Sequence, residues 1–127
     1  MAERRLIETG SPFEANYAYS RAMVRGDWCF IAGVTGYDYA TMTLPDDVAA
    51  QAENCFTTIA SVLAEAGFAM EDIVRVQHTM VDRADLEAVA PAFRRALGEI
   101  RPPATLVIAG LVQPEMRIEI EVTAFRG

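Results

Sequence analysis

The spacing of apolar residues changes along the chain, and this change constrains the fold most strongly. Between residues 47 and 67 apolar side chains recur every three or four positions, which predicts one amphipathic helix of about five turns. Pro45, Asp46 and Asp47 precede this helix and Gly67 follows it, as expected for helix ends. Its apolar stripe consists of Val48, Ala52, Cys55, Phe56, Ile59, Leu63 and Ala66.

A second, shorter helix is predicted after Asp82. Asp85 stands three residues further on, as in a capping box, and Gly98 ends the helix. Its apolar face carries Leu86, Val89, Phe93 and Leu97.

Around the helices the apolar period falls to two, which is typical of β-strands. In residues 73–81, Val74, Val76, His78 and Met80 share one face, and residues 116–125 alternate more cleanly. The remaining predicted strands are 19–24 and 28–35, joined as a hairpin across residues 25–27, then 105–112 as a fully buried strand, and 4–8 as an optional short one.

The order strand, strand, helix, strand, helix, strand, strand predicts a single α+β domain over residues 1–127, with both helices on one face of a mixed sheet. Two helices can cover only one face of the sheet. The apolar run 106–112, however, is typical of a strand that is buried on both faces. A partner chain is the simplest cover. We therefore expect a homo-oligomer with sites at subunit boundaries.

The charge balance excludes several classes of function. The chain has 11 basic residues, all of them Arg and scattered, against 18 acidic ones, a net charge of -7, so no continuous basic face is expected for nucleic acid. No apolar run approaches the roughly 18 residues of a membrane span, and the N-terminal segment lacks the apolar core of a signal peptide. We expect a cytoplasmic protein without a nucleic-acid or membrane partner.

The two cysteines and the one histidine predict no metal site and no nucleophilic triad. Cys29 and Cys55 lie in separate apolar stretches and are interpreted as buried thiols. His78 projects on the apolar side of its strand, which favours a core or rim histidine whose hydrogen bonds are satisfied. The glycines of residues 33–36 are interpreted as parts of a tight turn, with no phosphate cradle.

Three charged residues are candidates for chemistry. Glu119 and Glu121 lie on the strand face that the helices should leave uncovered. They are either a solvated face, or an interface desolvates one of them and raises its pKa into the range of a general base. Arg101 precedes two prolines that stiffen the chain, so it either forms a salt bridge or holds a substrate carboxylate.

Several segments in order along the chain resemble the RidA (YjgF-like) family. They include Tyr19-Ser20, the run from Gly26 through Trp28 to Gly33, residues 47–67, Asp72-Ile73-Val74, Arg101-Pro102, Ala109-Gly110-Leu111 and Ile118-Glu119-Ile120-Glu121-Val122. This resemblance implies a chorismate-mutase-like α+β fold and a homotrimer whose sheets form an inner barrel. It also implies three clefts between subunits that bind a small molecule.

The resemblance further implies an enzyme without a cofactor that hydrolyses reactive 2-imino or enamine acids to keto acids and ammonia. The family's water-positioning glutamate corresponds to Glu119, and its early-strand tyrosine to Tyr19. Its carboxylate-binding arginine has no counterpart, because Ala104 stands in its place. An asparagine of the family is also absent, with Ala90 at about that position.

We therefore predict Glu119 as the catalytic residue, with substrate-binding positions at Arg101, Tyr19, Ala104 and Thr105. The missing arginine predicts weak activity on 2-iminopropanoate. It leaves open either a role for Arg101 or a ligand that has no carboxylate. The alternative function is a non-catalytic trimeric protein that binds a small ligand or a partner in the same clefts. Some relatives cleave RNA or inhibit translation, but the acidic charge gives that activity little support.

Overall fold

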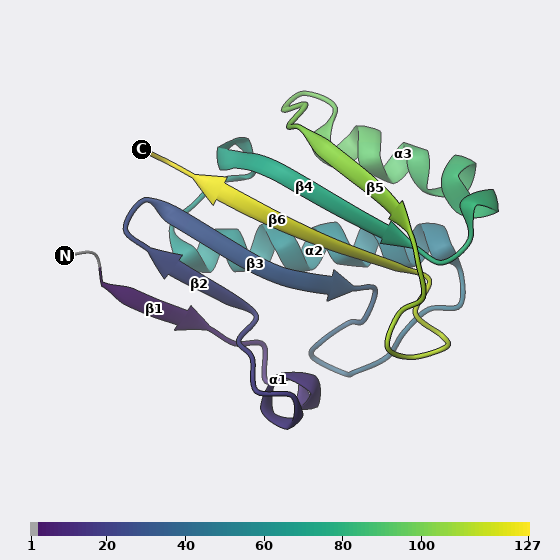
Figure 1. Ribbon diagram of the computed structural model, residues 1–127, viewed down its shortest axis with the longest axis horizontal. Coiled ribbons are helices and arrows are strands. Elements are labelled where there is room, and N and C mark those ends of the chain that lie inside the picture. Colours follow the sequence, from purple (N-terminus) through teal and green to yellow (C-terminus); the bar gives the residue numbers. More distant parts are fainter. Residues whose placement is uncertain (1–2) are drawn as a thin grey trace.

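The computed structural model describes residues 3–127, which form one six-stranded sheet with two long helices on one side (Figure 1). The strands are β1 (Arg4–Ile7), β2 (Ala22–Arg25), β3 (Trp28–Thr35), β4 (Ile73–Met80), β5 (Ala104–Ile108) and β6 (Ile118–Phe125). The helices are α1 (Pro12–Asn16), α2 (Val48–Ala66) and α3 (Leu86–Leu97). Short 3-10 turns at Met70–Asp72 and Arg83–Asp85 precede β4 and α3.

The strand order is β1-β2-β3-β6-β4-β5, so the last strand of the chain lies inside the sheet (Figure 1). β4 and β5 are parallel and are connected through α3, whereas all other neighbours are antiparallel. This mixed sheet confirms the predicted α+β class. The hairpin of β2 and β3 turns across Gly26 and Asp27, and Gly26 has a positive φ of 59° that suits glycine.

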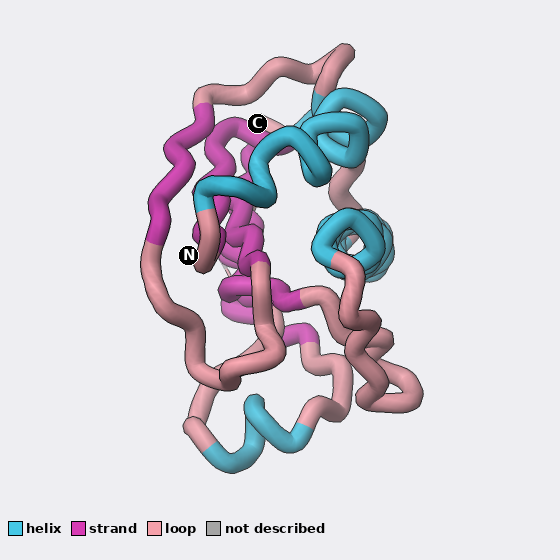
Figure 2. Tube along the Cα trace, turned by 90° about the vertical axis from the view of Figure 1, so that its right-hand side faces the viewer, coloured by secondary structure: helices cyan, strands magenta, loops and turns pink. Residues whose placement is uncertain are grey.

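The long helix α2 has the predicted ends. The Asp47 side chain accepts a hydrogen bond from the Ala50 amide at 2.9 Å, and Gly67 takes the left-handed conformation at the C-terminal end. Figure 2 shows α2 and α3 on the same side of the sheet, as predicted. No helix in residues 3–127 is long and apolar enough to cross a membrane.

The start of α3 and the short helix α1 differ from the prediction. Asp82 caps the 3-10 turn, where its side chain accepts from the Ala84 amide, and α3 begins only at Leu86. Leu86 is therefore exposed, while Val89 and Leu97 are buried. α1 is not predicted by the sequence pattern, because at five residues it is too short to show a helical period.

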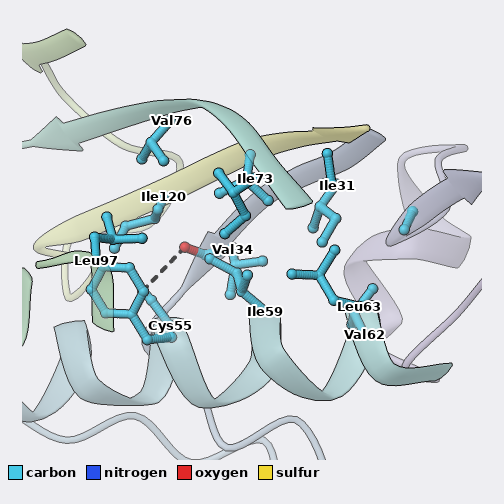
Figure 3. Packing of buried hydrophobic residues seen from close by; sticks show 14 of the residues in the cluster. Ile31, Val34, Cys55, Ile59, Val62, Leu63, Ile73, Val76, Leu97 and Ile120 are labelled. Atoms are coloured by element: carbon cyan, nitrogen blue, oxygen red, sulfur yellow. Dashed lines mark hydrogen bonds between the residues drawn. The ribbon is translucent and has the colours of Figure 1, made fainter. Parts of the chain in front are cut away.

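The core lies between α2 and the covered face of the sheet. Figure 3 shows Ile31, Val34 and Ile120 of the central strands above Ile59 and Leu63 of α2. The Cys55 thiol donates a hydrogen bond to the Val34 carbonyl at 3.2 Å, and both cysteines are buried and free, as interpreted from the sequence.

The faces of β4 differ from the prediction because the strand contains a β-bulge. The register of β4 against β6 shifts between Ile73 and Arg75. Ile73 is consequently buried, whereas Val74 points outward and is exposed. The strict alternation expected from the sequence fails because the extra residue of a bulge reverses the side-chain direction at that point.

The prediction of a fully buried strand at residues 105–112 is wrong for the single chain. β5 starts at Ala104, ends at Ile108, lies at the edge of the sheet, and all five of its residues are exposed. Trp28, Phe30 and Phe125 are also exposed, on the sheet face opposite the helices. This apolar face is the part of the molecule that a partner chain would cover, and the partner stays a prediction.

His78 is a core histidine, as predicted, but the expected hydrogen-bond partner for its ring is missing at the buried Nδ1 among residues 3–127. Its ring stacks on Phe93 of α3 with 4.2 Å between centroids. Burial lowers its pKa from 6.5 to about 4, because the charged imidazolium would lose its water here.

We predict that His78 makes the fold sensitive to acid. Its lowered pKa means that the unfolded chain binds the proton first, so stability is complete above about pH 6.5 and is lost as the pH falls toward 4. Between pH 7 and 5 the loss from this group should be about 2 kcal/mol. Urea unfolding of the wild type and of His78→Leu at both pH values measures it. Equal losses in the two proteins would contradict the prediction.

Candidate functional site

A cavity of about 310 Å³ lies at one end of β3 and β6 and contains the predicted catalytic glutamate. Its lining consists of Phe13, Tyr17, Tyr19, Gly33, Thr35, Tyr39, Val112, Met116 and Glu119. A wider groove of about 560 Å³ runs over β1, β2, β3 and β6, sharing Tyr19 and containing Glu121. We assign the site to the smaller cavity, because its carboxylate is the one shielded from water.

Gly33 allows the Glu119 carboxyl group to lie against the backbone of β3. A Cβ atom at this position would lie only 2.6 Å from Glu119 Oε1. The neighbouring Gly36 has a similar role, since its Cβ would lie 2.5 Å from the Cα of Gln51. Close approach of a neighbouring residue therefore explains both glycines. The tight turn predicted from the sequence is wrong for Gly33, because this residue lies within β3.

The two strand glutamates differ in their surroundings. Both lie on the uncovered face, as predicted, but Glu119 is half-buried and Glu121 is exposed. Burial raises the pKa of Glu119 above the usual value, the charge of Glu121 adds to this effect, and Arg21 opposes it. A carboxylate with a raised pKa binds a proton more strongly, which suits a group that accepts a proton from water.

The buried ion pair of Arg21 and Glu14 lies behind the cavity wall and contacts residues that line it. The Arg21 side chain is completely buried, with Nε 3.3 Å from Glu14 Oε2. Nη1 donates to the Gly33 carbonyl at 2.7 Å, and Nη2 donates to the Tyr19 hydroxyl at 3.4 Å. Glu14 also accepts hydrogen bonds from the amide and hydroxyl of Thr9.

Sequence reasoning missed Arg21. Nothing in the spacing singled it out, because its partner Glu14 belongs to the unpredicted helix α1. The only nearby signal was Tyr19, two residues earlier, whose hydroxyl Arg21 contacts.

Aromatic rings make up much of the cavity wall. Phe13 and Tyr17 come from α1 and its C-terminal cap and stack with 6.5 Å between centroids. The Tyr39 hydroxyl accepts a hydrogen bond from the Thr35 amide at 3.2 Å, which ties the loop after β3 to that strand. The Arg21 guanidinium lies over the Tyr39 ring, 4.8 Å from its centroid.

Gln51 fixes the chain that leads into β6. This completely buried side chain donates to the carbonyls of Pro45 and Glu115, at 2.8 and 3.1 Å. Its Oε1 accepts from the Arg117 amide at 2.9 Å. These hydrogen bonds fix the backbone on both sides of Met116, a residue of the cavity lining. Met116 lies two residues before the start of β6 and three before Glu119.

The predicted site residues form two groups in the single chain. Tyr19 and Glu119 line the cavity together, whereas Arg101, Ala104 and Thr105 are exposed at the far edge of the sheet. β4 lies between β5 and β6, and strand spacing and rise place the Cα atoms of Ala104 and Glu119 about 14 Å apart. Arg101 has a left-handed φ of 52° at the entry to this edge strand.

The cavity combines one carboxylate, the hydroxyls of Thr35 and its tyrosines, and apolar walls. Within residues 3–127 no three His, Cys, Asp or Glu side chains gather as a metal ion would require. The arrangement can bind a small apolar ligand and move a proton at one point of it.

A six-stranded mixed sheet, with two main helices on one face and a carboxylate cavity beside its bare face, defines a class of small α+β proteins. Residues 9–126 match the family described as Endoribonuclease L-PSP, and the chain belongs to this family of YjgF- and RidA-type proteins. The resemblance inferred from the sequence is thereby confirmed.

Relatives with known structures or names agree with this assignment. A crystal structure from Mycobacterium tuberculosis, of a member of the YjgF/YER057c/UK114 family, is 32% identical with a TM-score of 0.89, and the match covers 98% of this chain and 100% of that one. A 2-iminobutanoate/2-iminopropanoate deaminase from Capra hircus is 27% identical over 98% of this chain and 91% of its own. The 3-aminoacrylate deaminase RutC of Acinetobacter baylyi is 33% identical over 61% of this chain and 62% of its own.

We predict that Glu121→Gln lowers the pKa of Glu119 toward the usual value of a glutamate, because one source of the rise is the charge of Glu121. The Glu119 carboxyl titration, followed by carbon NMR, measures this shift. Glu99→Gln, at an exposed position after α3, serves as the control and should leave the titration unchanged. If the pKa of Glu119 is the same in Glu121→Gln as in the wild type, the two carboxylates do not interact.

Proposed function

We propose that the cavity hydrolyses a small reactive imine or enamine, releasing ammonia and a carbonyl product. The observation that carries this proposal is Glu119, a half-buried carboxylate with a raised pKa in an aromatic cavity. Membership of a family whose named relatives include two imine or enamine deaminases supports it.

In the proposed mechanism Glu119 accepts a proton from a water molecule as the water oxygen adds to the imine carbon. The imine nitrogen gains this proton from Glu119 and then the remaining hydroxyl proton, the C–N bond breaks, and the carbonyl bond forms as ammonia leaves. Tyr19 forms one wall that holds the substrate against Glu119. No cofactor enters this sequence, because water is the only co-reactant it needs.

We further propose that three chains assemble through the bare sheet face. The exposed apolar residues of β3, β5 and β6 support this assembly, since water-exposed apolar strands of this extent are typical of interfaces. A neighbouring chain would also offer its own β5 edge, and with it Arg101, Ala104 and Thr105, to the cavity. The two groups of predicted site residues would then meet between subunits.

A homotrimer is therefore the expected species in solution. Light scattering during size-exclusion chromatography should give about three times the 13.9 kDa of the chain at micromolar concentration. Arg replacement of Phe30, which is exposed on the bare face, should lower the measured mass because a charge would be buried in the interface. A stable monomer of the wild type would overturn the assembly.

The alternative is a non-catalytic protein that binds a ligand in the same cavity. The resemblance to the family favours it, because it implies that Ala104 stands at the position where the working deaminases carry arginine. A substrate carboxylate that loses its charged partner loses about 2 to 5 kcal/mol of binding.

We predict weak or absent activity on 2-iminopropanoate, with kcat/KM about two to three orders of magnitude below that of an arginine-bearing relative. The measurement is release of ammonia from the freshly generated imine. Ala104→Arg should raise the rate if the deaminase site has lost only its anchor. Arg101→Ala should abolish the remaining rate if Arg101 has taken over that role.

Glu119→Gln is the matched test of the catalytic group, because glutamine keeps the size of the side chain but accepts no proton. It should remove any measurable hydrolysis. Activity equal to that of a relative, unchanged in Glu119→Gln and Arg101→Ala, would refute the proposed function.

A further inference from the structure

We propose that the cavity selects an organic cation without a carboxylate, namely the protonated form of an imine that bears an apolar or aromatic substituent. This inference rests on the proposed hydrolysis and narrows its substrate class. It is carried by the charges and the rings that surround Glu119.

The lining contains one acidic group and no basic one. Among its nine residues, all within the described part of the chain, Glu119 has the only carboxyl group, and none is Lys, Arg or His. A carboxylate ligand would therefore meet a negative charge, while a cation would meet an opposite one. At short range and partial burial such a difference in charge decides which ligand binds.

Arg21 offsets this bias only in part, because its charge lies behind the wall and acts on Glu119 without contacting the ligand. Its side chain is completely buried and paired with the buried Glu14, so the pair is neutral overall. Its remaining hydrogen bonds go to the Gly33 carbonyl and the Tyr19 hydroxyl, and it is not part of the cavity surface. A ligand anion cannot reach the guanidinium without breaking these contacts.

The aromatic walls favour the same kind of ligand. A cation over an aromatic ring gains about 0.5 to 2 kcal/mol, depending on how far it is removed from water. Tyr19 and Tyr39 already lie beneath the Arg21 guanidinium, at 5.5 and 4.8 Å from their centroids. Phe13 and Tyr17 are therefore the rings that can contact a bound cation.

The volume of about 310 Å³ is at the lower end for small-molecule sites, which suits a ligand of about one ring. The reaction balances for such a substrate. Water adds through its oxygen to the carbon of the protonated imine and gives one proton to Glu119. That proton and the remaining hydroxyl proton pass to nitrogen, the C–N bond breaks, and a ketone or aldehyde and an ammonium ion result.

Binding of three probes of similar size tests the selection without any catalysis. Titration calorimetry would compare the binding of benzylammonium, benzyl alcohol and benzoate to the wild-type protein. We expect benzylammonium to bind at least about tenfold more tightly than benzyl alcohol, with benzoate the weakest. Benzoate binding as tight as or tighter than benzylammonium would overturn the inference.

Four variants assign the effect to the residues named here. Glu119→Gln should remove the advantage of benzylammonium over benzyl alcohol, while Glu99→Gln, the same change at an exposed position outside the cavity lining, should preserve it. Phe13→Leu, which keeps an apolar side chain, should weaken benzylammonium more than benzyl alcohol. If wild-type benzoate binding is strong and is lost in Arg101→Ala, a neighbouring chain supplies an anion anchor and the inference is wrong.

A rate comparison separates this inference from the proposed function. The substrates are benzaldehyde imine, generated from benzylamine by an amine oxidase, and 2-iminopropanoate. Faster ammonia release from 2-iminopropanoate would overturn the inference and leave imine hydrolysis standing. A third outcome is that the protein binds the three probes in the expected order but hydrolyses neither imine faster than the uncatalysed reaction does. That result would support the selection for a cation and refute the proposed hydrolysis.

Discussion

The ion pair between Arg21 and Glu14 is the interaction on which the site depends. Both side chains are buried, and removing one partner of such a pair typically costs about 3 to 5 kcal/mol because the other charge is left without compensation. The pair connects α1 to the segment before β2 and, through the Gly33 carbonyl, to β3. These are the elements that place Phe13, Tyr19 and Gly33 around the cavity.

The close approach of Glu119 to Gly33 adds the chemical feature of the site. Without a side chain at residue 33 the carboxyl group packs onto β3 and leaves water, which raises its pKa, while Glu121 stays exposed on the same strand face. One strand thus carries two glutamates with different properties. The difference arises from the neighbours of each side chain and not from the residue type.

The bare face of the sheet and the family membership bear on function in different ways. Exposed Trp28, Phe30 and Phe125, together with the β5 edge, support an assembly that would complete the cavity. The family accounts for the fold of the chain, and one of its relatives is named as an imine deaminase. Arg21 is paired with Glu14 and lies outside the cavity surface, so the cavity lining within one chain offers no basic side chain to a ligand.

The sequence by itself determined the elements whose signals are local. The period and ends of α2, the hairpin of β2 and β3, the alternation of β6 and the core position of His78 follow from neighbouring residues and were predicted correctly. Only the tertiary structure decided the bulge at Ile73, the exposure of β5, the packing role of Gly33 and the burial of Arg21. Each of these depends on a partner that is distant in the chain or on another strand, and apolar spacing carries no information about such partners.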